Sequence, residues 1–361
     1  MINPPSTEKI QRIRDAGGAS RALQWVLSGL TAASFDDLEL TEDSLRASLR
    51  SQGIPDALID QMVSTAKSGG AISSTAPVDL SGDALKEAES GAVNLALALA
   101  DSRTRIRDLE GSTATNSALA EKYRIDYPQS MELVRLESIE FVDRFPVLTG
   151  CFGFTRGELE PGASQLVPFR SSKGEYVVYG DVTKTEALLV RLKPSLVAQW
   201  LTQSGSNLET WNDDRSARIS ILKTARIPQP WDIAEFDSVG SKLLTLLHSY
   251  AHWFVRRLAV HSGVEQSALS EFLVPQHCAF FVYASSRGDF VLGGLQAVFE
   301  SDLDTFLKDL AQADLRCPLD PGCQRVGGAC MACLHLGEPS CRYYNRYLSR
   351  QTLMGANGYL A

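Results

Sequence analysis

The sequence predicts a mixed α+β protein with a helical N-terminal region, an α/β middle and a metal-binding α/β lobe at the C-terminus. Three observations carry this prediction. Apolar residues recur at helical spacing in the first third, β-branched and aromatic runs separated by turns follow, and five of the seven cysteines lie between Cys317 and Cys341. These shifts place domain boundaries at 1–115, 116–240 and 241–361.

Composition limits the functional classes. The chain has 361 residues, 44% of them hydrophobic and 22% charged, as expected of a globular protein with a substantial core. Its net charge of -8 argues against a protein that coats nucleic acid by itself, because such binding neutralises phosphates with Lys and Arg. Without a signal-like N-terminus or a long uncharged apolar run, the chain is expected to be cytoplasmic, where thiols stay reduced.

The first 115 residues should form helices. Apolar residues between Ala22 and Leu30 recur at helical spacing, Thr41 is a candidate cap, and Pro55 should begin a helix that stops at Gly69. A long helical run follows over 81–111. The region could contact a partner or simply form a helical bundle, and the sequence favours the bundle.

The middle and C-terminal segments should alternate strands with helices. Strands are expected over 176–182 and 187–194, and a helix over 195–203. A longer helix should run from about residue 241 to Gly263, followed by a short second helix over 264–274 and a buried strand over 278–284. No nucleotide-binding loop or helicase motif is recognisable, which predicts a chain without its own motor.

The cysteine cluster suggests a structural zinc site. Cys330 and Cys333 are separated by two residues, so they can bind one ion from a tight turn. Cys341 and Cys323 are the preferred third and fourth ligands, with Cys317 as the alternative. A redox dithiol or disulfides would also use cysteines, but the first needs a βαβ context and the second an oxidising compartment.

A second candidate site is the pair His248 and His252, four residues apart on one helical face. This spacing suits a helical metal site, and a nearby acid such as Glu265 or Glu271 could complete a metal-dependent nuclease. The glutamate of the metalloprotease motif is absent, because Ser249 follows His248. Histidines that pack in the core are the favoured explanation.

The C-terminal sequence also resembles a known family. The stretches CPLDPGC and ACMACLHLGEPSCRYYNRYLSR, with LLTLLHSYAHWFVRRL upstream, resemble the cysteine-rich C-terminal domain of DrmB-like proteins from DISARM phage-defence systems and of MrfA-type DNA-repair helicases. The resemblance runs from about Leu136 to the C-terminus. It implies that the thiolates hold a structural metal and that a separately encoded DNA helicase or translocase is the partner.

The resemblance thus implies a zinc-bearing, non-catalytic accessory subunit of a bacterial antiviral defence complex. Basic and aromatic residues alternate within the cysteine-rich lobe, which suggests contact with single-stranded or forked DNA or with an acidic partner surface. The candidate residues are Arg325, Arg342, Tyr343, Tyr344, Arg346 and Arg350. The nuclease and a purely structural adaptor are the alternatives.

Overall fold

The computed structural model describes fifteen segments of the chain. They are residues 7–32, 40–41, 46, 49–50, 54–68, 72–73, 80, 82–100, 102–112, 117–157, 165–232, 237–285, 292–312, 316–337 and 340–361.

Helices and strands are both well represented in these segments, which confirms the α+β prediction. The strands are β1 (Leu40–Thr41), β2 (Ile72–Ser73), β3 (Thr104–Arg105), β4 (Leu136–Cys151), β5 (Gly153–Arg156), β6 (Gln165–Pro168), β7 (Tyr179–Leu192), β8 (Leu269–Val274) and β9 (Ala279–Ala284). The α-helices are α1 (Thr7–Asp15), α2 (Gly18–Leu27), α4 (Asp56–Ser68), α5 (Gly82–Leu99), α6 (Ile106–Ser112), α7 (Ser117–Glu121), α8 (Tyr127–Leu133), α9 (Pro194–Gln203), α10 (Asp214–Thr224), α11 (Val239–Ser262), α12 (Gly294–Ala297), α13 (Leu303–Gln312), α14 (Gly322–Arg325) and α15 (Arg350–Met354).

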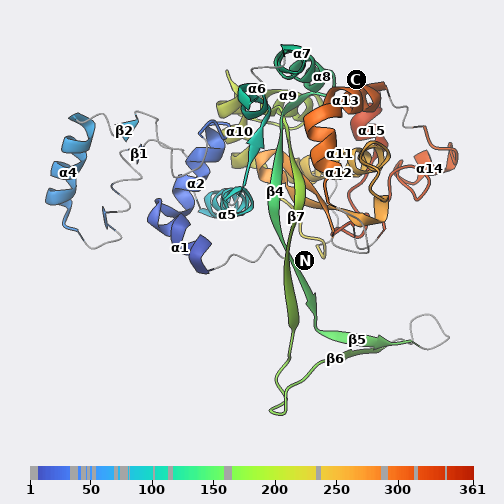
Figure 1. Ribbon diagram of the computed structural model, residues 1–361, viewed down its shortest axis with the longest axis horizontal. Helices are drawn as coiled ribbons and strands as arrows, with labels where there is room; N and C mark the ends of the chain where they lie inside the picture. Colours follow the sequence, from blue (N-terminus) through green and yellow to red (C-terminus); the bar gives the residue numbers. More distant parts are fainter. Residues whose placement is uncertain are drawn as a thin grey trace.

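The centre of the molecule is a five-stranded antiparallel sheet in the order β3-β4-β7-β9-β8. Two hydrophobic cores flank the sheet. Leu188 and Val190 of β7 belong to the core that contains α11, whereas Ala187 and Leu189 belong to the core that contains α2 and α5. Helices therefore cover both faces (Figure 1). Burial on both faces explains why β9, predicted over 278–284, reads as an unbroken apolar run.

Strands from all three predicted segments join this one sheet. The strand β3 precedes residue 115, β4 and β7 lie between 116 and 240, and β8 and β9 follow residue 241. The division at 1–115, 116–240 and 241–361 stays a prediction, and the shared sheet shows that the three segments contribute to a common core.

The helix α11 carries the histidine pair through the middle of one core. The Ser238 hydroxyl accepts a hydrogen bond from the Ser241 amide at the first turn, and Gly263 ends the helix with a left-handed φ of 67°. Most of its side chains are buried, so the helix is surrounded rather than amphipathic. Its predicted end at Gly263 is confirmed.

The segment after Gly263 does not form the predicted helix over 264–274. A single 3₁₀ turn, Gln266–Ala268, leads into strand β8, which pairs with β9 along Leu269–Val274. Short apolar runs fit either helix or strand, and here pairing with β9 decides the outcome. The predicted helix was wrong. The strand changes the direction of the Glu271 side chain, because residues two apart in a strand, such as Leu269 and Glu271, point toward the same face of the sheet.

Two long strands extend beyond the sheet as an arm. Strands β4 and β7 stay paired as far as Cys151 and Tyr179, and the β5–β6 hairpin continues from them (Figure 1). Large apolar side chains are exposed along this arm, namely Phe152, Phe154, Leu166, Val167, Tyr176, Val178, Tyr179 and Val182. The Cys151 thiol is exposed here as well.

The N-terminal helices follow the prediction only in part. Helices α1, α2 and α5 pack together, and α2 and α5 cover one face of the sheet. The long run expected over 81–111 is divided, because α5 ends at Leu99 and β3 intervenes before α6. The helix expected to begin at Thr41 falls mostly outside the described residues.

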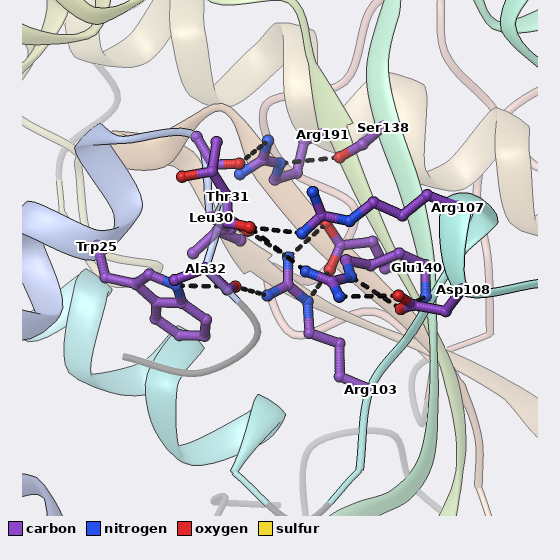
Figure 2. A network of polar contacts seen from close by, with 12 residues as sticks. Trp25, Leu30, Thr31, Ala32, Arg103, Arg107, Asp108, Ser138, Glu140 and Arg191 are labelled. Carbon is purple, nitrogen blue, oxygen red and sulfur yellow. Dashed lines mark hydrogen bonds and ion pairs between the residues drawn. The ribbon is translucent and has the colours of Figure 1, made fainter. Parts of the chain in front are cut away.

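Arginines line a pocket of about 680 Å³ where the chain leaving α2 meets the sheet (Figure 2). The Arg103 guanidinium donates to the Ala32 carbonyl at 2.9 Å and pairs with the Glu140 carboxylate at 3.0 Å. Arg191 donates to the Gly29 carbonyl at 3.0 Å. These bonds fasten the loop after α2 to β4 and β7, so this arginine cluster has a structural role.

His277 gives the fold a predicted acid sensitivity. It is buried and its Nε2 lies 2.8 Å from the Ala88 carbonyl oxygen, to which it donates when neutral. Burial, aided by Arg218 and Arg191, lowers the pKa of His277 to about 4 from 6.5. Because the folded pKa is depressed, this stability is present above pH 6.5 and is lost as the pH falls toward 4, by about 3 kcal/mol.

Urea unfolding between pH 7 and pH 4.5 tests this expectation on wild type and His277→Gln, which keeps an amide donor near the Nε2 position but cannot titrate. The variant should lose less stability on acidification. Equal losses in the two proteins would contradict the assignment, and acid effects elsewhere in the chain cancel in the comparison.

Within the described residues, no helix is both long enough and apolar enough to cross a membrane.

Candidate metal centres

Four cysteines of the C-terminal lobe come together in one cluster, called here the four-cysteine cluster. It consists of Cys317, Cys323, Cys330 and Cys333, whose sulfur atoms all lie within 4.8 Å of one another. The Sγ atoms of Cys317 and Cys330 are 3.5 Å apart, those of Cys330 and Cys333 3.7 Å, and those of Cys323 and Cys333 3.8 Å. A tetrahedral zinc ion with Zn–S bonds of about 2.3 Å requires S–S separations of about 3.8 Å.

The local backbone is arranged to support thiolates. The Cys330 amide donates to the Cys333 sulfur at 3.2 Å, and the Leu319 amide donates to the Cys317 sulfur at 3.4 Å. The turn from Cys330 to Cys333 is closed by the Leu334 amide, which donates to the Cys330 carbonyl at 2.9 Å. Amides directed at sulfur stabilise the deprotonated form, which is the form that binds metal.

Burial and hydrogen bonding within the four-cysteine cluster shift the pKa values of its thiols in opposite directions. Burial together with hydrogen bonding to neighbouring thiols raises the pKa of Cys323 to about 12. The pKa of Cys330 is lowered to about 7, because hydrogen bonds, first from Cys317, outweigh the raising effect of burial. Four thiolates at this separation repel one another, so a bound cation is the natural means of deprotonating all four.

The four clustered cysteines differ from the predicted zinc ligands in one member. Cys317, the alternative ligand, lies in the four-cysteine cluster, whereas Cys341 lies elsewhere. The reason is the backbone after Cys333: the loop passes α11, and the Sγ of Cys341 comes within 3.2 Å of Nε2 of His248. The three other predicted ligands, Cys323, Cys330 and Cys333, lie together.

Cys341 belongs to a second group of potential ligands, the mixed cluster of His248, His252, Glu271 and Cys341, whose ligand atoms also lie within 4.8 Å of one another. Nε2 of His248 is 3.1 Å from Oε1 of Glu271, and Nε2 of His252 is 3.5 Å from the same oxygen. All four side chains are buried. The histidine pair singled out in the sequence therefore has acid and thiol neighbours.

Interactions among the ionisable side chains of the mixed cluster shift their pKa values against the effect of burial. Burial alone would lower the pKa of His248, but the Glu271 carboxylate and the Cys341 thiol raise it to about 10. Burial alone would raise the pKa of Glu271, yet the two imidazoles hold it well below its usual range. Hydrogen bonds, first with His248, lower the pKa of Cys341 to about 7 against the effect of burial.

Two arginines of the predicted basic and aromatic patch form hydrogen bonds and ion pairs within the protein. Arg350 is buried, donates to the Gly328 carbonyl at 3.0 Å and pairs with Asp320 at 2.7 Å, which braces two loops of the four-cysteine cluster. Arg346 donates to the carbonyls of Pro230 and Asp232. The bonds of both arginines are structural, and those of Arg346 connect the C-terminal segment to the segment before α11.

The remaining members of the patch are more accessible. Arg325 is exposed, and Tyr344 is 70% exposed. The Arg342 guanidinium lies 5.5 Å from the centre of the Phe272 ring, and half-buried Tyr343 approaches His248 with 5.6 Å between ring centres. Only Arg325 and Tyr344 therefore present free surface of the kind that nucleic acid would need.

Glu271 is the functional candidate that sequence reasoning placed least well. It was named with Glu265 as a nearby acid, but on a helix rather than a strand. Glu265 is exposed at the 3₁₀ turn, whereas Glu271 is buried beneath α11. The period-two pattern of Leu269, Glu271 and Leu273 was the available signal, since it places the acid on a buried strand face.

Comparison with known proteins gives one informative match. No model of a known protein family matches the chain. Over 183 residues, 47% of its length, the chain is 26% identical to the DISARM protein DrmB of Bacillus paralicheniformis, and this match covers 31% of the Bacillus protein. The chain is thus similar to a DISARM protein over about half of its own length and about a third of the relative's.

Proposed function

We propose that this protein is a zinc-bearing, non-catalytic accessory subunit of a bacterial antiphage defence complex that works with a separately encoded DNA helicase or translocase. The similarity to DrmB supports the defence context. The four-cysteine cluster carries the structural part of the proposal, because its S–S distances match those of a tetrahedral zinc-thiolate site.

The zinc would hold a lobe that has little regular structure of its own. Between Arg316 and Gly337 the described chain forms one short helix, α14, and otherwise turns. Such a segment gains much of its folding free energy from a bound metal. A fixed lobe next to α11 can then present a constant surface to a partner.

The arm supports a partner-binding role. It carries exposed aromatic and aliphatic side chains on paired strands that continue directly from the central sheet. Contiguous apolar surface of this kind is typical of protein interaction sites. We assign the arm to contact with the helicase or translocase subunit.

DNA contact depends on two exposed residues near the cysteines. Arg325 and Tyr344 are exposed on the cysteine-rich lobe and could contact a phosphate and stack on a base. Arg346 and Arg350 are engaged with backbone carbonyls and Asp320. A DNA-binding surface at this lobe would therefore be smaller than the sequence suggested.

Copurification from the native operon, with metal content read by elemental analysis, tests the accessory-subunit proposal. The expected result is a stable complex with an ATPase and zinc bound to this chain. Replacing Val178 and Val182 of the arm by Ser should release the partner while leaving the metal content unchanged. A matched control is Val260→Ser, because Val260 on α11 is 73% exposed but lies outside the arm.

A metal-free chain that purifies alone would contradict the proposal, and retention of the partner by the arm variant would remove the arm from it. For DNA, the slope of log affinity against log salt for a single strand should become about 0.7 less steep in Arg325→Ala if one phosphate contact is lost. Lys86→Ala is the control, since Lys86 is an exposed cation on α5. Identical slopes in both variants would leave a structural adaptor without DNA affinity.

A further inference from the structure

We propose that the mixed cluster of His248, His252, Glu271 and Cys341 binds a second metal ion, of the zinc class, in a closed structural site. The ligands come from α11, strand β8 and the loop that follows the four-cysteine cluster. A hydrogen bond of 3.2 Å between the Glu271 amide and the Ser340 carbonyl holds strand and loop side by side. The site is separate from the four-cysteine cluster and shares no ligand with it.

The distances suit one central ion. Nε2 of His248 lies 3.1 Å from Oε1 of Glu271 and 3.2 Å from Sγ of Cys341, and Nε2 of His252 lies 3.5 Å from Oε1. Bonds of about 2.0 Å to nitrogen and oxygen and about 2.3 Å to sulfur give tetrahedral edges of about 3.3 to 3.6 Å. The observed separations lie within about 0.3 Å of these values, so little movement is needed.

Neighbouring groups orient the ligands as metal sites require. Nδ1 of His252 is 2.8 Å from the Leu334 carbonyl oxygen, so Nδ1 carries the proton and donates it, and the Nε2 lone pair faces the cluster. The Asn345 backbone N–H donates to the Cys341 sulfur at 3.2 Å. Asn345 is itself fixed by two hydrogen bonds to the backbone of Leu336, at 2.9 and 3.0 Å.

A metal-free network of charged side chains explains the cluster less well. Among the described residues, neither carboxylate oxygen of Glu271 has a hydrogen bond of good geometry, and Nε2 of His252 has none either. A buried carboxylate without hydrogen bonds is costly. One cation at the centre gives a partner to Oε1 and to Nε2 of His252 at the same time, and it stabilises the Cys341 thiolate.

The ligand set indicates a structural site. Four protein ligands from four buried side chains complete a tetrahedron, whereas catalytic zinc sites keep a position for water or substrate. Two imidazoles, one carboxylate and one thiolate suit zinc or a competing transition ion better than magnesium or calcium, which prefer oxygen. This assignment replaces the nuclease that the histidine spacing suggested.

Counting ions on the whole 361-residue chain tests the proposal. Native mass spectrometry and elemental analysis of wild type grown with zinc should find two ions per chain. The zinc X-ray absorption spectrum should show five sulfur and three nitrogen or oxygen ligands over the two ions, because each cluster contributes four. A single ion with an all-sulfur shell, or a metal-free chain, would overturn the second site.

Single substitutions show which cluster binds each ion. Cys341→Ala should bind one ion, with an all-sulfur spectrum, whereas Cys278→Ala should keep two, because Cys278 is an equally buried thiol with no part in either cluster. If Cys341→Ala does not fold, the wild-type spectrum still decides. A single ion with three nitrogen or oxygen ligands and one sulfur would support this site while refuting the four-cysteine site, so the two assignments fail separately.

Discussion

Cys330→Ser is expected to release the metal proposed for the four-cysteine cluster and to unfold the lobe between Arg316 and Gly337. Structural zinc contributes about 10 to 16 kcal/mol in small zinc-binding peptides, and a serine hydroxyl is a poor replacement for a thiolate. With one short helix in the described part of this lobe, little else holds its loops. Metal analysis, limited proteolysis and thermal unfolding should all show the loss, with new cleavage confined to the lobe.

The control is Cys151→Ser, because Cys151 is an exposed thiol on the arm with no clustered partner among the described residues. It should keep the metal, the melting temperature and the protease resistance of wild type. A Cys330→Ser protein that bound as many ions as wild type and kept its protease resistance would show that the four-cysteine cluster holds reduced core thiols instead.

Glu137→Gln should lower the free energy of unfolding by about 3 to 5 kcal/mol, since it removes the charge between two buried arginines. The Glu137 carboxylate is 2.8 Å from the Arg191 guanidinium and also pairs with Arg218. Both arginine side chains are at most 3% exposed. Burial lowers the pKa of Arg191 and Glu137 opposes this, so removing the carboxylate leaves a costly buried cation.

Urea unfolding measures this effect, with Glu209→Gln as the matched control. Glu209 pairs with Lys223 at 2.8 Å, but its side chain is 62% exposed, so the loss should be at most about 1 kcal/mol. Equal losses in the two variants would mean that water or another acid compensates the buried arginines, contrary to the geometry.

Local signals predicted much of the fold. The α+β class, the end of α11 at Gly263 and the buried strand β9 follow from periodicity and capping, which depend on near neighbours in sequence. The segment 264–274 was assigned to the wrong element, because pairing with β9 cannot be seen in an eleven-residue window. The same limitation hid the continuity of β7, which the sequence divided into two strands.

The candidate sites were predictable as residue types but not as partnerships. Spacing identified the cysteines and the histidine pair, yet Cys341 lies 93 residues from His248 and contacts it only because the loop passes α11. The basic and aromatic patch shows the same limitation. Arg346 and Arg350 read as nucleic-acid ligands, whereas their partners are carbonyls supplied by Asp232 and Gly328.

The hydrogen bond between His252 and the Leu334 carbonyl has a thermodynamic consequence. Leu334 directly follows Cys333, so an ion in the four-cysteine cluster also fixes the carbonyl that orients His252. With two ions bound as proposed, the first therefore reduces the entropy lost on binding the second, and the free-energy coupling is reciprocal. Metal titrations should then show positive cooperativity, with the singly loaded protein scarce at half saturation.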